Sequence, residues 1–313
     1  FNRNFRGRND ARAETMNAIV SPEIALAFAL AGRVTFNPLT DALIGADGRS
    51  FVPAPPAPAP DVPGQGFEPP GVYLAPPADA SGVEIAIAPD SARLQRLAPW
   101  SRWGGKDIAG MPVLVKASGK TTTDQISPAG RWLAWRGHLD RFSDNLLMGA
   151  LNAWTGERGL TRDIAGAVTS QPIAAVARAY RQRGWRWAIV ADANYGEGSS
   201  REHAGLSPRL LGCPAVIARS FARIHESNLK KQGLLALTFR DPADYERIRE
   251  GDRLSLTGLA QMRAGLPLSC RVAHADGTSE VLELAHSYSD EQLGWFRAGS
   301  ALNCMALAQG ARR

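Results

Sequence analysis

The stretch GEGSSREH, which begins at Gly196, places two serine hydroxyls and an arginine on one turn. Its two glycines permit a sharp turn after a short apolar strand, and Ser199 or Ser200 could cap the helix that follows. A helix N-terminus stabilises an anion, and the planar guanidinium of Arg201 matches a carboxylate. A serine alkoxide held by such donors could abstract an activated proton. The stretch predicts carboxylate binding and proton abstraction, although an ordinary turn with a serine cap fits it as well.

Two further stretches combine acidic or polar residues with arginines. In GKTTTDQISPAGRWLAWRGHLD, residues 119–140, Asp124 and Arg136 flank a Ser-Pro-Ala-Gly turn. In NRNFRGR, near the start of the sequence, Arg3 and Arg8 could clamp carboxylates. Taken singly, the first stretch also fits a surface turn with an ion pair, and the second fits a solvated tail.

The composition indicates a globular protein. With 313 residues and 44% hydrophobic content the chain can bury a substantial core, and its length favours about two domains. No apolar run approaches the roughly 20 residues of a membrane span, so we expect no membrane role. The net charge of +6 comes from basic residues scattered singly, which favours a solvated surface over a nucleic-acid face. Three distant cysteines without a C-x-x-C pair indicate a reduced, intracellular compartment.

The first part of the chain reads as a short folded segment followed by a linker. A helix is predicted to begin at Ser21-Pro22-Glu23, because serine can cap it and proline is favoured at the first helical position, and to stop at Gly32. From Pro53 to Pro77 lie ten of the 21 prolines, which neither continue a helix nor donate to a sheet. This segment is predicted to be an extended, semi-rigid connector.

Beyond the linker, predicted strands alternate with predicted helices. Such alternation implies a parallel or mixed sheet, whose ligand crevice lies beyond the carboxyl ends of the strands. GEGSSREH follows one of those ends. The predicted strands cover 111–116, 185–191, 214–218 and 235–239, and the predicted helices cover 143–154, 172–183, 200–211 and 221–232.

The motifs together resemble the aconitase family, in its mitochondrial type. They follow one another in collinear order from NRNFRGRNDA through SPEIALAFALAG, GKTTTDQISPAG, RGHLD, DANYGEGSSREHAGLSPRLLG, SFARIHESNLKKQGLL and TFRDPADY to WFRAGSALN. The resemblance covers essentially the whole chain and points to the C-terminal part of an aconitase. It implies an α/β fold: residues 1–51 as the end of the third, core domain, 52–89 as a Pro-rich linker, and 90–313 as the swivel domain, a mixed sheet with flanking helices.

The resemblance also implies an activity and a site. The activity is aconitate hydratase, a lyase of the tricarboxylic acid cycle that interconverts citrate and isocitrate through cis-aconitate. Ser199 resembles the catalytic base and Asp124 an active-site acid that orients its partners. The implied substrate-binding residues are Arg3, Arg8, Arg136, Ser200 and Arg201, and Asn2 resembles a residue that supports the cluster by hydrogen bonding. Four arginines would hold the three carboxylates in register.

The implied cofactor is a [4Fe-4S] cluster, whose iron would act as a Lewis acid on the departing hydroxyl. Cys213, Cys270 and Cys304 match none of the family's cluster ligands, which are expected upstream together with a histidine that protonates the hydroxyl. The chain is therefore expected to hold no metal and to be inactive without N-terminal domains. Gln125 replaces the histidine usual in TTDHIS, which removes a titratable group beside Asp124.

The five histidines are not expected to be metal ligands, because none has suitable spacing. His138, His203 and His225 fall within matched motifs and are predicted to be satisfied structural groups, whereas His274 and His286 are predicted on a surface strand pair.

Two alternatives stay open. One is a sister hydro-lyase acting on homoaconitate, methylcitrate or isopropylmalate-type acids. The other is a cluster-free, non-catalytic or RNA-binding form, against which the absence of basic clusters argues. We expect a monomer when complete, located in the mitochondrial matrix of a eukaryote or the cytoplasm of a bacterium. The polar start at Phe1, without a signal-peptide core, looks like a cut edge.

Overall fold

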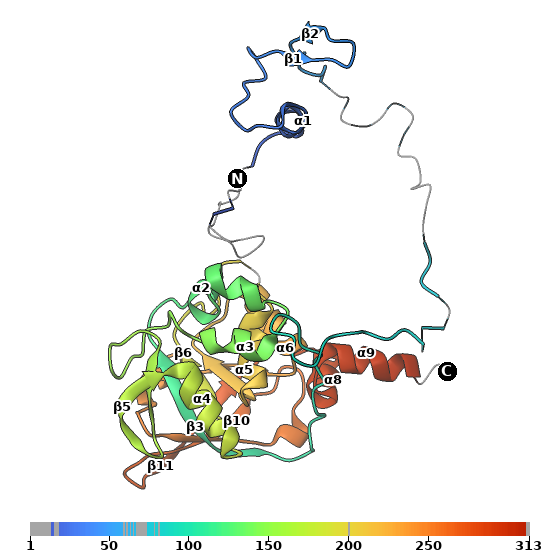
Figure 1. Ribbon diagram of the computed structural model, residues 1–313. Helices are drawn as coiled ribbons and strands as arrows, with labels where there is room; N and C mark the ends of the chain where they lie inside the picture. Colours follow the sequence, from blue (N-terminus) through green and yellow to red (C-terminus); the bar gives the residue numbers. More distant parts are fainter. Residues whose placement is uncertain are drawn as a thin grey trace. The chain divides into compact units, whose positions relative to one another are not determined.

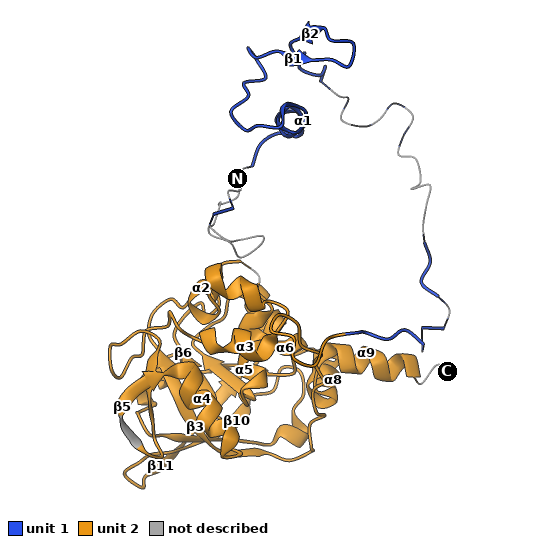
Figure 2. Ribbon diagram, in the orientation of Figure 1, with its two compact units in different colours: residues 1–6, 13–86 blue, residues 7–12, 87–313 orange. Residues whose placement is uncertain are grey.

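A computed structural model describes residues 14–15, 19–58, 60, 62, 64, 66, 74–77, 79–80, 82–199 and 201–310. The chain divides into two compact units, of which the first holds the described residues up to Ala86 and the second those from Ile87 onward (Figure 2). No helix in these ranges is long and apolar enough to cross a membrane. The predicted domain limits at 51 and 89 concern the family's domains and stay a prediction.

Unit 1 contains one helix and one small hairpin. Helix α1 spans Pro22–Ala31, and the hairpin pairs β1 (Leu43–Ile44) with β2 (Ser50–Phe51). Ser21 Oγ accepts a hydrogen bond from the N–H of Ile24, and Gly32 ends the helix with a φ of 65°, which favours glycine. The predicted start and stop of this helix are confirmed.

Helix α1 leaves most of its apolar surface uncovered. Ala27 is its buried residue, whereas the side chains of Leu26 and Leu30 are 61% and 63% exposed. Ile44 on the hairpin is 71% exposed. Leu26 and Leu30 lie four positions apart, so both project from the same face of the helix.

Unit 2 is built on seven strands that close into a barrel (Figure 1). Three neighbouring pairs, β3–β6, β6–β7 and β7–β8, are parallel, and the other four pairs are antiparallel. The predicted mixed sheet is confirmed, while its closure was not predicted. The strands are β3 (Ile108–Ala117), β6 (Ala188–Ala191), β7 (Ala215–Ala218), β8 (Leu235–Phe239), β9 (Arg253–Thr257), β10 (Leu268–Ala273) and β11 (Ser279–Ala285), in the order β10-β11-β8-β7-β6-β3-β9.

Helices and a second hairpin flank the barrel (Figure 1). The crossovers β6–α5–β7 and β7–α6–β8 produce the parallel pairs, since parallel strands need a long connection. The α-helices of unit 2 are α2 (Thr123–Ile126), α3 (Leu139–Phe142), α4 (Ile173–Gln182), α5 (His203–Leu210), α6 (Arg223–Lys231), α7 (Asp244–Arg247), α8 (Asp290–Ala298) and α9 (Ala301–Gly310). The 3₁₀ helices are η1 (Gly130–Trp135), η2 (Ser143–Asn145) and η3 (Leu259–Gln261), and the hairpin is β4 (Leu160–Asp163) with β5 (Ala167–Pro172).

The strands divide their buried side chains between two cores. Along β6, Ala188 and Val190 join a cluster that draws on all seven strands and fills the barrel. Ile189 and Ala191 join a second cluster, shared with helices α4, α5 and α6. This alternation follows from the two-residue period of a strand, and it explains why the sequence shows continuous apolar runs there.

The helix predicted over 143–154 is wrong. Only η2 is helical in that stretch, and Leu147 has a φ of 56°. Its backbone pairs with other segments: the N–H of Ser118 donates to Leu151 O at 2.8 Å and that of Ala153 to Lys116 O at 2.7 Å. These bonds to the end of β3 replace the i to i−4 bonds that a helix would need.

Candidate functional site

The loops that follow β3 and β6 are bonded to each other. Both strands are parallel neighbours, so Ala117 and Ala191 end at the same edge of the sheet. Beyond them, the N–H of Gly196 donates to Thr121 O at 2.8 Å and the N–H of Thr123 donates to Glu197 O at 2.8 Å. GEGSSREH and GKTTTDQIS therefore meet, because they follow the carboxyl ends of neighbouring parallel strands.

Ser199 lies exposed on the tight turn of the second loop. Gly196 and Gly198 have φ values of 85° and 110°, which confirms that the two glycines make the turn. Thr123 Oγ1 donates to the carbonyl of Ser199 at 2.8 Å. The backbone of Ser199 is thereby fixed to α2 although the residue is exposed.

Arg201 reaches from the turn to α2 and the residue after it. Its guanidinium forms an ion pair with Asp124 Oδ1, and its Nη1 donates to Ser127 O at 3.0 Å. The Arg201 side chain is 18% exposed, so part of the fork remains accessible. Asp124 therefore holds the guanidinium of Arg201 by an ion pair, while its role in a reaction stays a prediction.

Arg136 follows η1, and its backbone is tied to α5. His203 Nε2 lies 2.9 Å from Arg136 O. Because a carbonyl only accepts, Nε2 carries the proton, and burial lowers the pKa of His203, which favours the neutral ring. Within the described ranges the exposed Arg136 guanidinium has no ion-pair partner, so it is available to a ligand.

The remaining predicted site residues, Asn2, Arg3, Arg8 and Ser200, lie outside the described residues. The structure thus brings Ser199, Asp124 and Arg201 together on two bonded loops, with Arg136 on the segment that α5 contacts.

Residues 111–242 match the family described as the aconitase C-terminal domain. A mitochondrial aconitate hydratase of Arthroderma benhamiae is 51% identical over 98% of this chain and 39% of its own length. This chain belongs to the aconitase family. An aconitate hydratase of Gracilaria gracilis is 51% identical over 99% of the chain and 40% of its own length, and that of Saccharomyces cerevisiae is 48% identical over 97% and 39%. The chain spans about two fifths of the length of these relatives.

A 3-isopropylmalate dehydratase structure from Methanocaldococcus jannaschii is similar with a TM-score of 0.43 and 20% identity, covering 66% of this chain and 100% of that chain.

The serine cap predicted for α5 of this aconitase chain is wrong. The helix begins at His203, and Glu202 occupies the N-cap position. Ser199 lies upstream because its carbonyl is bonded to Thr123 and Arg201 is drawn to Asp124, which extends the turn. The site is a glycine turn with a guanidinium, and not a helix N-terminus.

Gln125, the departure from the usual aconitase motif, has a structural task. Its side chain accepts from the N–H of Thr122 at 2.8 Å, and its own N–H donates to Thr122 Oγ1 at 3.3 Å. This capping box fixes the start of α2 and with it Asp124. The sequence pattern T-x-x-Q carries this signal, so Thr122 could have been predicted.

The ring of His225 packs against the glycine turn at Gly196. A Cβ at Gly196 would lie 2.1 Å from His225 Cδ2, so this close approach requires glycine. His225 is 1% exposed, and neither ring nitrogen has a hydrogen-bond partner in the described part of the chain. The prediction that the His225 ring has hydrogen-bond partners is therefore wrong.

The prediction of a surface position for His274 is also wrong: the ring is buried and lies 2.9 Å from Asp252 Oδ1.

Burial of His225 is expected to make stability depend on pH. Its pKa falls from 6.5 to about 4, because burial disfavours the charged ring. The unfolded chain takes up a proton below pH 6.5, so stability is lost as pH falls from 6.5 to about 4, by about 3 kcal/mol in total. Urea unfolding measures the free energy of unfolding of this chain and of His225→Leu at each pH across that window. We expect this free energy to change less with pH in the variant. Parallel curves would contradict the burial of a neutral ring.

The cysteines of this aconitase chain do not fit a cluster site. Cys213 and Cys270 are buried in the two different cores, and burial raises the pKa of each thiol to about 12. A metal ligand must be a thiolate, which such burial opposes. Cys304 lies apart on α9, and in the described ranges no group of three metal-binding side chains occurs.

Proposed function

We propose that this chain supplies the catalytic base and carboxylate clamps of an aconitate hydratase that interconverts citrate and isocitrate through cis-aconitate. The observation that carries the proposal is the joining of the two loops, which places Ser199 on a glycine turn beside Arg201 held by Asp124. A base and an anion clamp at one sheet edge suit proton abstraction next to a carboxylate.

In the proposed reaction Arg201 and Arg136 bind two substrate carboxylates. Ser199 Oγ, as the alkoxide, takes the proton from the carbon next to a carboxylate; the electron pair of that C–H bond forms the double bond of cis-aconitate, and hydroxide leaves the neighbouring carbon. Hydration reverses these steps. Arg3, Arg8 and Ser200 would complete the clamp, and Asp124 would hold the Arg201 fork in the orientation that two parallel N–H donors need.

Aconitases carry a [4Fe-4S] cluster, and we propose that ligands outside this chain hold it, with Asn2 supporting it.

We further propose that unit 1 completes a domain of the longer enzyme. The exposed apolar side chains of α1, Leu26 and Leu30, offer a surface for that contact. In this proposal residues 1–51 end the core domain, 52–89 connect, and 90–313 form the swivel domain of a monomer. A eukaryotic source would place it in the mitochondrial matrix, and a bacterial source in the cytoplasm.

A substrate comparison tests the proposal. The chain would be joined to the unmatched part of the Saccharomyces cerevisiae relative, which gives a protein we refer to as the joined enzyme. We expect kcat/KM for cis-aconitate to exceed that for homoaconitate, methylcitrate and isopropylmalate at least tenfold. Homoaconitate and methylcitrate carry an extra carbon that a site fitted to cis-aconitate must accommodate, and isopropylmalate lacks one of the three carboxylates. Higher activity with one of the other acids would assign a sister hydro-lyase. A folded joined enzyme that binds RNA and lacks turnover would replace the proposal with a binding role.

A further inference from the structure

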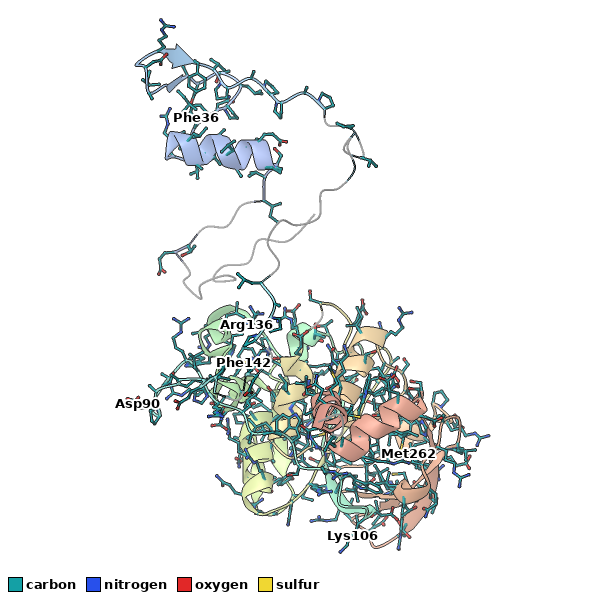
Figure 3. All side chains as sticks on the ribbon, turned by 90° about the vertical axis from the view of Figure 1, so that its right-hand side faces the viewer. Phe36, Asp90, Lys106, Arg136, Phe142 and Met262 are labelled. Atoms are coloured by element: carbon teal, nitrogen blue, oxygen red, sulfur yellow. The ribbon has the colours of Figure 1, made fainter. Side chains whose placement is uncertain are left out.

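A cavity lies at the end of unit 2 away from the candidate site. Its volume is about 480 Å³, and it is lined by residues just before and at the start of β3, by residues before β6 and by the first residue of β9. The site loops follow the opposite ends of β3 and β6. Figure 3 shows Lys106, of this cavity, and Arg136 at opposite ends of the unit. The side chains that matter are those of Trp103, Lys106, Asp107, Trp185, Arg186 and Arg253.

The cavity has an excess of positive charge. Lys106, Arg186 and Arg253 line it, and in the ranges that the structure describes none of them has an ion-pair partner. The carboxylate of Asp107 is already engaged, because it accepts from two backbone N–H groups at 3.2 and 3.0 Å. Three cationic side chains therefore line the cavity, whereas its single carboxylate is hydrogen-bonded to backbone N–H groups. The excess of positive charge favours an anionic ligand.

Two fixed indole rings form the walls. Trp103 Nε1 donates to Lys106 O at 2.9 Å, and its ring centroid lies 5.4 Å from that of Phe296. The Trp185 ring lies 5.5 Å from that of Tyr180, on α4. Both rings are half-buried, so their orientation is set by packing before a ligand arrives.

The guanidinium of Arg253 lies over the Trp185 ring. Its Cζ lies 4.7 Å from the centroid of Trp185, and its Nη1 donates to Gly110 O at 3.0 Å. These contacts fix the plane of the guanidinium and use one of its donors. The other N–H groups can bind a phosphate in a bidentate manner.

We propose that this cavity binds a nucleoside phosphate, with its phosphates on Lys106, Arg186 and Arg253 and its base against the Trp103 ring, since guanidinium groups already lie over Trp185. A simple anion would use the cations and leave the aromatic walls unused, whereas a nucleotide uses both. The volume suits one small molecule. This site is separate from the proposed hydratase site, and its test does not depend on turnover.

Calorimetric titration of the 313-residue chain with ATP tests the proposal. We expect saturable binding that weakens about tenfold in Lys106→Ala and in Arg186→Ala, which is the loss of one charge-assisted contact. Both side chains are exposed, so these variants are expected to fold. Arg240→Ala is the matched control, because Arg240 pairs with Glu283 on β11 and does not line the cavity. We expect Trp103→Leu to weaken ATP without weakening pyrophosphate.

Competition distinguishes the alternatives. Retention of ATP in the presence of citrate, with pyrophosphate binding more weakly than ATP, would support the proposal. Displacement by citrate would place ATP at the carboxylate site and overturn it. Equal affinity for pyrophosphate, affinity that grows with the length of a single-stranded oligonucleotide, an equal effect of Arg240→Ala, or the absence of saturable binding at millimolar ATP would each overturn it as well.

Discussion

Replacing Ser199 with alanine in the joined enzyme is expected to lower kcat for isocitrate by about 1,000-fold and to leave the Kd for citrate within about twofold. The reason is that Ser199 Oγ acts on the proton during the reaction, while arginines supply most of the ground-state binding. The turn itself should persist, because its fixed points are the Ser199 carbonyl and the two glycines, which the substitution leaves in place.

Steady-state kinetics together with calorimetric citrate binding measure the two effects separately. Ser227→Ala is the control, because the Ser227 hydroxyl donates within its own helix, to Arg223 O. An equal loss of rate and of citrate binding in Ser199→Ala would contradict the assignment of the base and would indicate a binding role for the hydroxyl.

Replacing Arg201 with lysine is expected to reduce kcat/KM by roughly 100-fold, about 3 kcal/mol, with weaker citrate binding as part of the loss. An ammonium keeps the charge but cannot bond Asp124, Ser127 O and a carboxylate through one planar fork. Arg240→Lys, at an exposed pair remote in sequence from the site, should change kcat/KM less than twofold.

The ion pair predicts coupling between its members. Asp124→Asn alone is expected to cost about tenfold in kcat/KM, because the Arg201 fork loses the carboxylate that orients it. Adding Asp124→Asn to Arg201→Lys should then lower kcat/KM little further, since Arg201→Lys has already disrupted the pairing of Asp124 with the guanidinium. Fully multiplicative losses would show that the two side chains act independently and would contradict the orienting role of Asp124.

Local sequence signals were sufficient for the elements that are determined by interactions between residues close in sequence. Ser21 and Gly32 bound α1 as their capping preferences predict, and the apolar runs of β6, β7 and β8 became strands within three residues of the predicted limits. The alternation of strands and helices also placed GEGSSREH at the carboxyl end of a strand, whereas the pairing of β3 with β6, which brings Asp124 beside it, was not predicted. Arg201 was recognised from its residue type and its place on the turn.

The remaining features depend on contacts between distant residues, which periodicity does not carry. The stretch 143–154 has a helical spacing of apolar residues, yet its backbone donates to the end of β3. His225 lies on α6, which follows β7, whereas Gly196 follows β6. Only the packing of these segments in the fold brings the two residues into contact. The start of α5 moved because Arg201 bonds Asp124, a pairing across 77 positions of sequence. Closure of the barrel likewise requires β9 to pair with β3.

A crystal structure of the joined enzyme with isocitrate bound tests the proposed roles of Ser199 and Arg201 directly. We expect Ser199 Oγ about 3 to 3.5 Å from the carbon that loses its proton, which is the reach of a near-attack geometry, with Arg201 bidentate on a carboxylate and still paired with Asp124. Substrate bound with Ser199 Oγ directed away from that carbon, or with Arg201 on no carboxylate, would contradict both roles.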